Sequence, residues 1–307
     1  MAARAHATLK ELMRLRGRVH GFSLLPHQQP GGALAGRHTS RLRGRGLDFV
    51  ELRRYQDGDD VRAIDWPATA RQRAPYVRVH AEERDRAALL VVDQRLSMFF
   101  GSRRATKSVA AAEVAALAVW RIERAGDRIG AIVFDDNECA SVRPARGQIA
   151  GQRVLSEIVR LNSRLRADGG ASNPDALNRA LAEAAKFATH DWLVVLISDA
   201  AGADATTTRL VSTIAVHNDV FAIFIFDPLE ATLPALGPVV VAEGTTRLAV
   251  DTNATSLRKG FAQDFATRRA AVANFCRHRA LPVIEVRTDA DPGAQIRAAL
   301  QARRHAA

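Results

Sequence analysis

The feature that most constrains the fold is a series of short, continuous apolar segments, each separated from the next by a helical pattern. The segments read AALLVVD, DRIGAIVF, WLVVLISD, VFAIFIF and PVIEVR. Because successive side chains of a strand point to opposite faces, an uninterrupted apolar run predicts a strand that is buried on both faces. Strands alternating with helices predict an α/β fold: a doubly wound, mostly parallel sheet of Rossmann-like type, with helices on both faces.

The intervening segments predict helices at about 106–125, 148–165, 173–187, 207–217 and 256–279, and a last helix from Gly293. Ser172 or Asn173 would cap the third of these, with Pro174 in its first turn. The stretch PVVVAEGTTRLAVDT predicts a hairpin after the strand VFAIFIF. No apolar run approaches the roughly 18 residues that a spanning helix needs, so we expect no membrane span.

The chain divides into three parts of different texture. Residues 1–18 form a basic leader, expected to be a charged helix, and residues 19–86 form a Gly-rich, β-containing extension with the motif GDDVRAIDW. Residues 87–307 contain the α/β domain, which ends in the hairpin and further helices. Cys139 and Cys276 lie in unrelated contexts without CxxC spacing, which predicts reduced thiols in a cytoplasmic protein.

The formal net charge of +11 is concentrated near the N-terminus. Through Arg45 the chain has nine Lys and Arg residues and one acid, Glu11, which gives +8. Such an arm can bind nucleic acid or an anionic surface, and this is one alternative function; the other interpretation is a solvated leader. Few aromatic residues accompany the arginines, so a stacking platform for bases is missing and we do not expect nucleic acid as the partner.

Two of the predicted strands end in aspartates. Asp93 ends LLVVD and Asp199 ends VVLISD, at the edge where an open parallel sheet binds its ligands. Ser97 follows the first strand, and Ser172 lies in the loop GGASNP before a helix. Oxygen ligands of this kind suit a divalent cation, which would allow a metal-dependent phosphohydrolase as a further alternative. The simpler interpretation is that each side chain only caps a strand or a helix.

The stretch GSRRATKS, Gly101 to Ser108, resembles a phosphate-binding loop but departs from it. Thr106 replaces the second glycine, and the loop begins well past the end of its strand. We therefore expect no nucleotide here and a solvated Lys107 near the start of a helix. The chain has no HExxH, no Gly-x-Ser-x-Gly and no GxGxxG after the first strand, so nothing in it predicts an enzyme.

The segment YQDGDDVRAIDWPATAR, Tyr55 to Arg71, together with LLVVDQRLSM resembles the bacterial family known as domain of unknown function 58. The resemblance runs from about Gly36 to the C-terminus and implies a β-rich leader joined to a von Willebrand factor A-like domain. It also implies a non-enzymatic protein-interaction scaffold, commonly encoded beside a MoxR-type AAA+ ATPase and acting with it in the assembly or activation of other protein complexes.

Many domains of the von Willebrand factor A type bind partners through a metal-ion-dependent adhesion site of pattern Asp-x-Ser-x-Ser. By resemblance, Asp93 matches the first Asp, Ser97 the last Ser and Asp199 an Asp from a later loop. Arg95 stands at the middle Ser. The family's threonine corresponds to Ala171 by strict spacing, or to Ser172 after a shift of one residue.

Arg95 changes what such a site can do. A guanidinium offers no lone pair to a metal and is not deprotonated in a protein. If Arg95 points inward, it can form a bidentate pair with Asp93 or Asp199 in place of the cation; if it points outward, the site is only weakened. We expect a degenerate adhesion site without a cofactor, or at most weak Mg²⁺ binding by Asp93, Ser97 and Asp199.

The motif of the extension alternates carboxylates with arginines around a tryptophan. We expect an ion-pair cluster that fastens the extension to the α/β domain, with the tryptophan as its apolar plug; the alternative is an interaction surface. The residues of this cluster are Tyr55, Asp59, Asp60, Arg62, Asp65, Trp66 and Arg71.

Overall fold

The computed structural model describes residues 3–19, 47–72, 74–82, 87–243, 246–275 and 281–306. The chain forms two compact units. The main unit comprises Met1–Pro26 and Arg86–Ala307, and the small unit comprises His27–Asp85. The predictions for the Gly-rich stretch 20–46, for Cys276 and for the end of the helix predicted to reach residue 279 lie outside the described residues.

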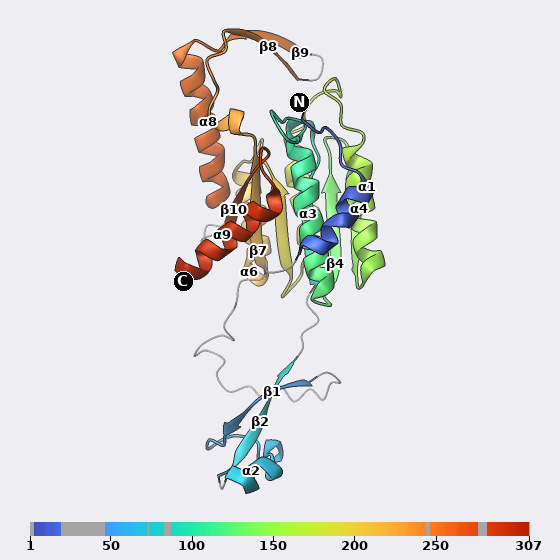
Figure 1. The fold of residues 1–307 in the computed structure, drawn as a ribbon, viewed down its shortest axis with the longest axis vertical. Coiled ribbons are helices and arrows are strands. Elements are labelled where there is room, and N and C mark those ends of the chain that lie inside the picture. Colours follow the sequence, from blue (N-terminus) through green and yellow to red (C-terminus); the bar gives the residue numbers. More distant parts are fainter. Residues whose placement is uncertain are drawn as a thin grey trace. The chain divides into compact units, whose positions relative to one another are not determined.

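The main unit is built on a six-stranded sheet of order β10-β7-β6-β3-β4-β5 (Figure 1). Its strands are β3 (Ala87–Asp93), β4 (Arg128–Phe134), β5 (Cys139–Ala145), β6 (Leu193–Ser198), β7 (Asp219–Phe226) and β10 (Val283–Arg287). All neighbouring pairs are parallel except β4 with β5. The predicted mixed α/β fold with a mostly parallel sheet is confirmed.

Helices cover both faces of this sheet. The helices of the main unit are α1 (Leu9–Arg14), α3 (Lys107–Arg124), α4 (Gln148–Asn162), α5 (Asp175–Phe187), α6 (Ala205–His217), α7 (Pro228–Ala231), α8 (Thr255–Ala273) and α9 (Pro292–Ala306). Leu90 and Val92 of β3 face a core shared with α1, α3, α4 and α9, whereas Leu89 and Val91 face a core shared with α5, α6 and α8. The strand is therefore buried on both sides, as its continuous apolar sequence predicts.

The N-terminal segment is folded onto the main unit instead of forming a free arm. Thr8 and Glu11 form a capping box at the start of α1, which continues into a short 3₁₀ helix, Leu15–Arg18. Leu12 is fully buried, and its carbonyl oxygen accepts a hydrogen bond from Nε1 of the buried Trp120 in α3 at 2.9 Å. Over its described part, 3–19, the solvated leader considered above is therefore wrong.

The sequence analysis did not predict strand β5 or helix α7 of the main unit. Strand β5 reads CASVRPA, and its partly exposed, Arg- and Pro-containing pattern is typical of an edge strand instead of a buried one. Helix α7 is a single turn with its own capping box between Asp227 and Glu230. The predicted hairpin is present as β8 (Pro238–Glu243) and β9 (Thr246–Asp251).

The small unit contains an antiparallel pair, β1 (Leu47–Arg54) and β2 (Tyr76–Glu82). A 3₁₀ turn, Val61–Ala63, and helix α2, Trp66–Gln72, lie between these two strands in the sequence. This agrees with a β-containing extension. Tyr55 continues the ladder beyond β1 by donating its backbone N–H to Pro75 O at 2.9 Å.

The side chains of the small unit depart from the expected ion-pair cluster. Asp59 pairs with Arg53, a residue outside the predicted set, through two hydrogen bonds of 2.8 and 2.9 Å. Asp60 accepts from the backbone N–H of Arg62, and Asp65 accepts from that of Ala68, because short carboxylates satisfy the free N–H groups of turns and helix starts.

The basic and aromatic members of the predicted cluster are exposed. Arg62 and Arg71 are exposed and form no ion pair among the described residues, and Trp66 is 67% exposed, so it is not a plug within this unit. Whether the motif fastens the extension to the α/β domain stays a prediction.

Candidate functional site

The carboxyl ends of two neighbouring strands form the candidate site. Asp93 is the last residue of β3, and Asp199 directly follows β6. The two strands are parallel neighbours with Val92 opposite Ile197, so both carboxylates lie at one edge of the sheet, and both are fully buried. The sequence predicted this convergence.

Arg95 points inward and pairs with Asp93. Its Nε donates to Asp93 Oδ1 at 3.0 Å and its Nη2 to Asp93 Oδ2 at 2.6 Å, while Nη2 lies 3.7 Å from Asp199 Oδ1. Nη1 donates to the carbonyl oxygen of Ala201 at 3.0 Å. Burial disfavours the charged guanidinium, but Asp93 and Asp199 outweigh it and raise the pKa of Arg95 above its usual value. Arg95 is therefore a fixed positive charge inside the site.

Asp93 is surrounded by donors. Besides the guanidinium, it accepts from the backbone N–H of Arg95 at 3.0 Å and from the hydroxyl of Ser198 at 2.7 Å. A buried carboxylate is tolerated only when its oxygens are satisfied in this way. These bonds occupy the positions from which Asp93 would coordinate a cation.

Lys107 supplies a second internal cation, and its predicted solvation is wrong. It is the first residue of α3 and is 2% exposed. Its Nζ donates to Asp199 Oδ2 at 2.7 Å and to Glu230 Oε1 at 2.8 Å. Helix α3 is buried along nearly its whole length, so its first turn faces the strand ends instead of solvent. The alanine-rich sequence of this helix was the signal that could have revealed the burial.

The charged neighbours of Asp199 and Lys107 determine the protonation states of these two side chains. Burial disfavours both charges, yet Lys107 and Arg95 hold the pKa of Asp199 far below its usual range. Asp199 and Glu230 likewise outweigh burial and raise the pKa of Lys107. Both groups therefore stay ionised at neutral pH.

The loop GSRRATKS delivers Lys107 to the site. A Cβ on Gly101 would lie 2.2 Å from the carbonyl oxygen of Ala105, so the turn requires a glycine there. Thr106 caps α3, and the backbone N–H of Lys107 donates to Phe100 O at 2.7 Å. The glycine and the lysine that resemble a phosphate loop thus have local structural roles.

Ser97, Ala171 and Ser172 lie around a cavity next to Asp199 and Lys107. Ser97 Oγ is 3.5 Å from Asp199 Oδ1, and both Ala171 and Ser172 line the cavity. Asp136 was missed in the sequence, although it follows β4 in the acidic stretch FDDN. It accepts from the backbone N–H groups of Leu96 at 2.6 Å and Asn173 at 2.7 Å, and so ties the two loops together.

A cavity of about 810 Å³ opens above these charges. Its polar floor includes Lys107, Asp199 and Glu230, and Arg268 lies 3.5 Å from Glu230. Its apolar wall is formed by Leu96, Phe99, Phe100, Val241, Leu248 and Phe261, of which Val241 and Leu248 are half exposed or more. We call Asp93, Arg95, Ser97, Lys107, Asp199 and Glu230 the strand-end site.

The strand-end site is a cluster of internally paired charges, in which two cations contact three carboxylates. Each of its buried carboxylates has a cationic partner, and each cation has at least one carboxylate within 2.8 Å. Within the described ranges, no group of three or more His, Cys, Asp or Glu side chains is arranged to hold a metal.

The sequence profile of a family described as protein of unknown function DUF58 matches residues 51–271. The chain belongs to this DUF58 family. Uncharacterised proteins of Mycobacterium bovis and Mycobacterium tuberculosis are 31% identical to it over 283 residues, which cover 91% of this chain and 86% of theirs. An uncharacterised protein of Mycobacterium avium is 34% identical over 116 residues, 38% of this chain and 68% of its own length.

Two solved structures resemble this DUF58 protein more distantly. They are a conserved hypothetical protein BatB from Bacteroides thetaiotaomicron, with a TM-score of 0.44, and an aerotolerance-related membrane protein from Bacteroides fragilis, with a TM-score of 0.43. Each is 16% identical and covers 72% of this chain; the chain covers 98% and 100% of theirs. In the described part of the DUF58 chain, no helix is both long enough and apolar enough to cross a membrane.

Proposed function

We propose that this DUF58 protein is a non-enzymatic scaffold that binds protein partners at the strand-end site. In this proposal it has a von Willebrand factor A-like domain and acts with a MoxR-type AAA+ ATPase to assemble or activate other protein complexes. The observation that carries the proposal is the pairing of Asp199 with Lys107 in the lining of an open cavity, with the buried Asp93–Arg95 pair next to Asp199. We take the protein to be cytoplasmic, since its cysteines show no pattern of a disulfide framework.

Electrostatics support recognition without a metal. A divalent cation about 4 Å from a guanidinium is repelled by several kcal/mol at an effective dielectric constant of about 20. Lys107 adds a second repulsion at Asp199. In this degenerate adhesion site, Arg95 and Lys107 therefore replace the metal, and a partner would not be bridged through a bound cation.

The cavity wall supports a protein segment as the occupant. Phe100, Val241, Leu248 and Phe261 present apolar side chains that are at least 39% exposed, around a polar floor. Protein interfaces combine an apolar centre with a few polar groups that set orientation. We expect the ATPase or its client to insert an apolar side chain here.

Metal titration tests the proposal that the strand-end site binds its partners without a metal ion. We expect Mg²⁺ and Mn²⁺ to leave the melting temperature of the wild-type protein unchanged at constant ionic strength. The double variant Arg95→Ser/Lys107→Ser has the hydroxyl that the adhesion-site pattern places at position 95 and lacks both cations, so Mn²⁺ should stabilise it. Arg95→Ser alone should respond weakly because Lys107 remains. Saturable binding to the wild type that is lost in Asp93→Ala would contradict this proposal.

A capture experiment tests the partner clause. The purified MoxR-type ATPase from the same organism is presented to the full-length protein with ATP and without nucleotide. We expect retention in at least one state, with Leu248→Glu weakening it about tenfold because a charge enters the apolar wall. Val216→Glu is the matched control, since Val216 is also exposed but lies on α6 outside the cavity. No retention in either state would reject the partnership.

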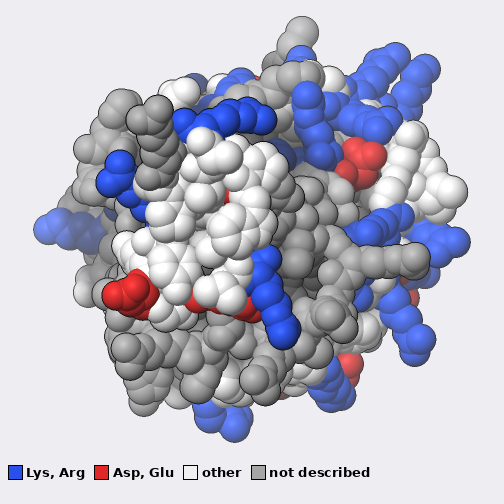
Figure 2. Space-filling model, turned by 90° about the horizontal axis from the view of Figure 1, so that it is seen from below, with Lys and Arg blue, Asp and Glu red and all other residues white. Residues whose placement is uncertain are grey.

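The basic arm does not lead us to propose nucleic-acid binding. Three arginines of the N-terminal segment have internal partners: Arg4 pairs with Glu11 and Glu113, Arg16 pairs with Glu123, and Arg18 pairs with Asp291. Figure 2 shows Lys and Arg side chains in several places on this face, interspersed with Asp and Glu side chains. A phosphohydrolase is not proposed either, because Asp93 and Asp199 are each held by an internal cation.

A further inference from the structure

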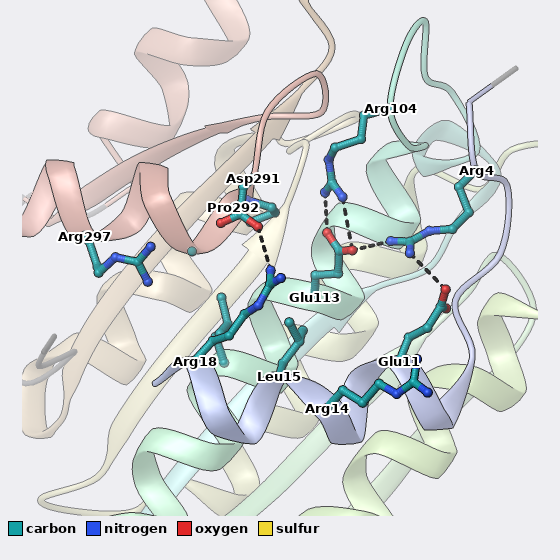
Figure 3. Close-up of a pocket in the computed structure, with 12 residues that line it drawn as sticks. Arg4, Glu11, Arg14, Leu15, Arg18, Arg104, Glu113, Asp291, Pro292 and Arg297 are labelled. Atoms are coloured by element: carbon teal, nitrogen blue, oxygen red, sulfur yellow. Dashed lines mark hydrogen bonds and ion pairs between the residues drawn. The ribbon is translucent and has the colours of Figure 1, made fainter. Parts of the chain in front are cut away.

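A second cavity, of about 290 Å³, lies between the N-terminal segment, α3 and the start of α9 (Figure 3). It shares no lining residue with the strand-end cavity. Five arginines line it together with three carboxylates, which leaves a formal charge of +2. These residues, which we call the arginine pocket, are Arg4, Arg14, Arg18, Arg104, Arg297, Glu11, Glu113 and Asp291.

Glu113 of α3 organises one side of the arginine pocket. It accepts from Arg4 with one carboxylate oxygen and from Arg104 with the other, so the two guanidinium groups converge on it (Figure 3). Arg4 also reaches Glu11 at 3.1 Å. The pairs hold both arginines in place while the side chains stay about one-third exposed, at 34% and 31%.

The opposite side of the pocket has more donors than acceptors. Asp291 accepts from Arg18 at 3.3 Å with Oδ2, and its Oδ1 is engaged by the backbone N–H of Ala294 at the start of α9. Arg297 is half buried, points from α9 toward the interior of the pocket (Figure 3), and forms no ion pair among the described residues. Because Arg297 has no ion pair among the described residues, its guanidinium can bind an anion without breaking an existing pair.

We propose that the arginine pocket binds a phosphomonoester, with its phosphate dianion held by Arg297, Arg18 and Arg104. The charge of such a group at neutral pH matches the excess of +2, and planar guanidinium groups bind phosphate oxygens in a bidentate way. The start of α9, with Pro292 and Gly293 in the lining, adds the positive end of a helix dipole.

The lining also indicates a small organic part on the ligand. Leu15, Leu117 and Pro292 give the pocket an apolar side that a bare phosphate would leave uncovered. The volume is near the lower end of the ~300–1,000 Å³ that small-molecule pockets span. An extended acidic peptide would place most of its length outside such a cavity, so we assign the site to a small molecule.

Titration calorimetry on the full-length protein tests this assignment with three probes: phenyl phosphate, inorganic phosphate and hexaglutamate. Sodium chloride keeps the ionic strength constant, and phenol is the control for the organic part. We expect saturable binding of phenyl phosphate and weaker binding of inorganic phosphate, with none of phenol. Equal affinity for the two phosphates would assign the site to the free anion, and both results support a phosphate site.

Variants that each lack one arginine test whether the binding measured by calorimetry takes place in the arginine pocket. Arg297→Gln should weaken phenyl phosphate about tenfold, as expected for the loss of one charge-assisted bidentate contact. Arg209→Gln removes the same charge from an exposed position on α6 and should leave the affinity unchanged. The proposal is overturned by equal weakening in both variants, by no saturable phosphate binding, or by hexaglutamate binding where phosphate does not.

Discussion

The strand-end site and the arginine pocket both contain cationic side chains and carboxylates, but they differ in how these charges are balanced. At the strand ends, Arg95 and Lys107 are 1% and 2% exposed, and each carboxylate of the site contacts one of these cations. In the arginine pocket, Arg18 is 66% exposed and arginines outnumber carboxylates. A buried charge must be neutralised within the fold, whereas a charge in contact with water can be left in excess.

This difference separates stability from binding. Removing a cation from the strand-end site leaves a carboxylate buried without its partner, so the free energy of unfolding decreases. Removing an arginine from the arginine pocket leaves the remaining groups hydrated, so the fold is little affected and the affinity for an anionic ligand decreases.

The largest expected effect is that of Lys107→Met. Asp199 and Glu230 would lose their shared cation in the interior, and we expect the free energy of unfolding in urea to fall by about 3–5 kcal/mol. Lys186→Met is the control, because Lys186 pairs with Glu183 at the surface and such a pair contributes less than about 1 kcal/mol. Similar losses in the two variants would show that Lys107 is not the buried partner described here.

The acid stability of the protein should show a smaller effect with a defined sign. The pKa of Asp199 is lower in the folded chain than the ~3.9 of an unfolded aspartate, so its stabilisation is complete above that pH. As the pH falls below ~3.9, each unit should remove up to about 1.4 kcal/mol through this group. Asp199→Asn should be less stable at neutral pH but should have a shallower dependence between about pH 2 and 4. Urea titrations across this range that give parallel curves would argue against the prediction.

The apolar pattern predicted the centre of the strand-end site. The continuous apolar residues of LLVVD are enough to predict a buried strand, and the parallel arrangement of the strands then places Asp93 beside Asp199. The inward direction of Arg95 was one of two options, because it depends on Ala201 and Asp199, which are distant in the sequence.

Lys107 and Glu230 show why the rest of that site could not be predicted. Their contact joins the first turn of α3 to the single-turn helix α7, 123 residues away. Arg4 and Glu113 are likewise separated by 109 residues. No local pattern encodes these pairs, so a basic leader looks the same in sequence whether it is solvated or folded onto α3.

The smallest expected effect is that of Arg297→Gln on stability. Arg297 has no ion pair among the described residues and shares its surroundings with other arginines, so its removal relieves like-charge repulsion. We expect the free energy of unfolding in urea to change by no more than about 0.5 kcal/mol, the range of ordinary surface substitutions. A loss comparable to that of Lys107→Met would make Arg297 a structural residue and remove the contrast between the two regions. An unchanged fold with weaker phosphate binding would instead show that the excess charge serves a ligand.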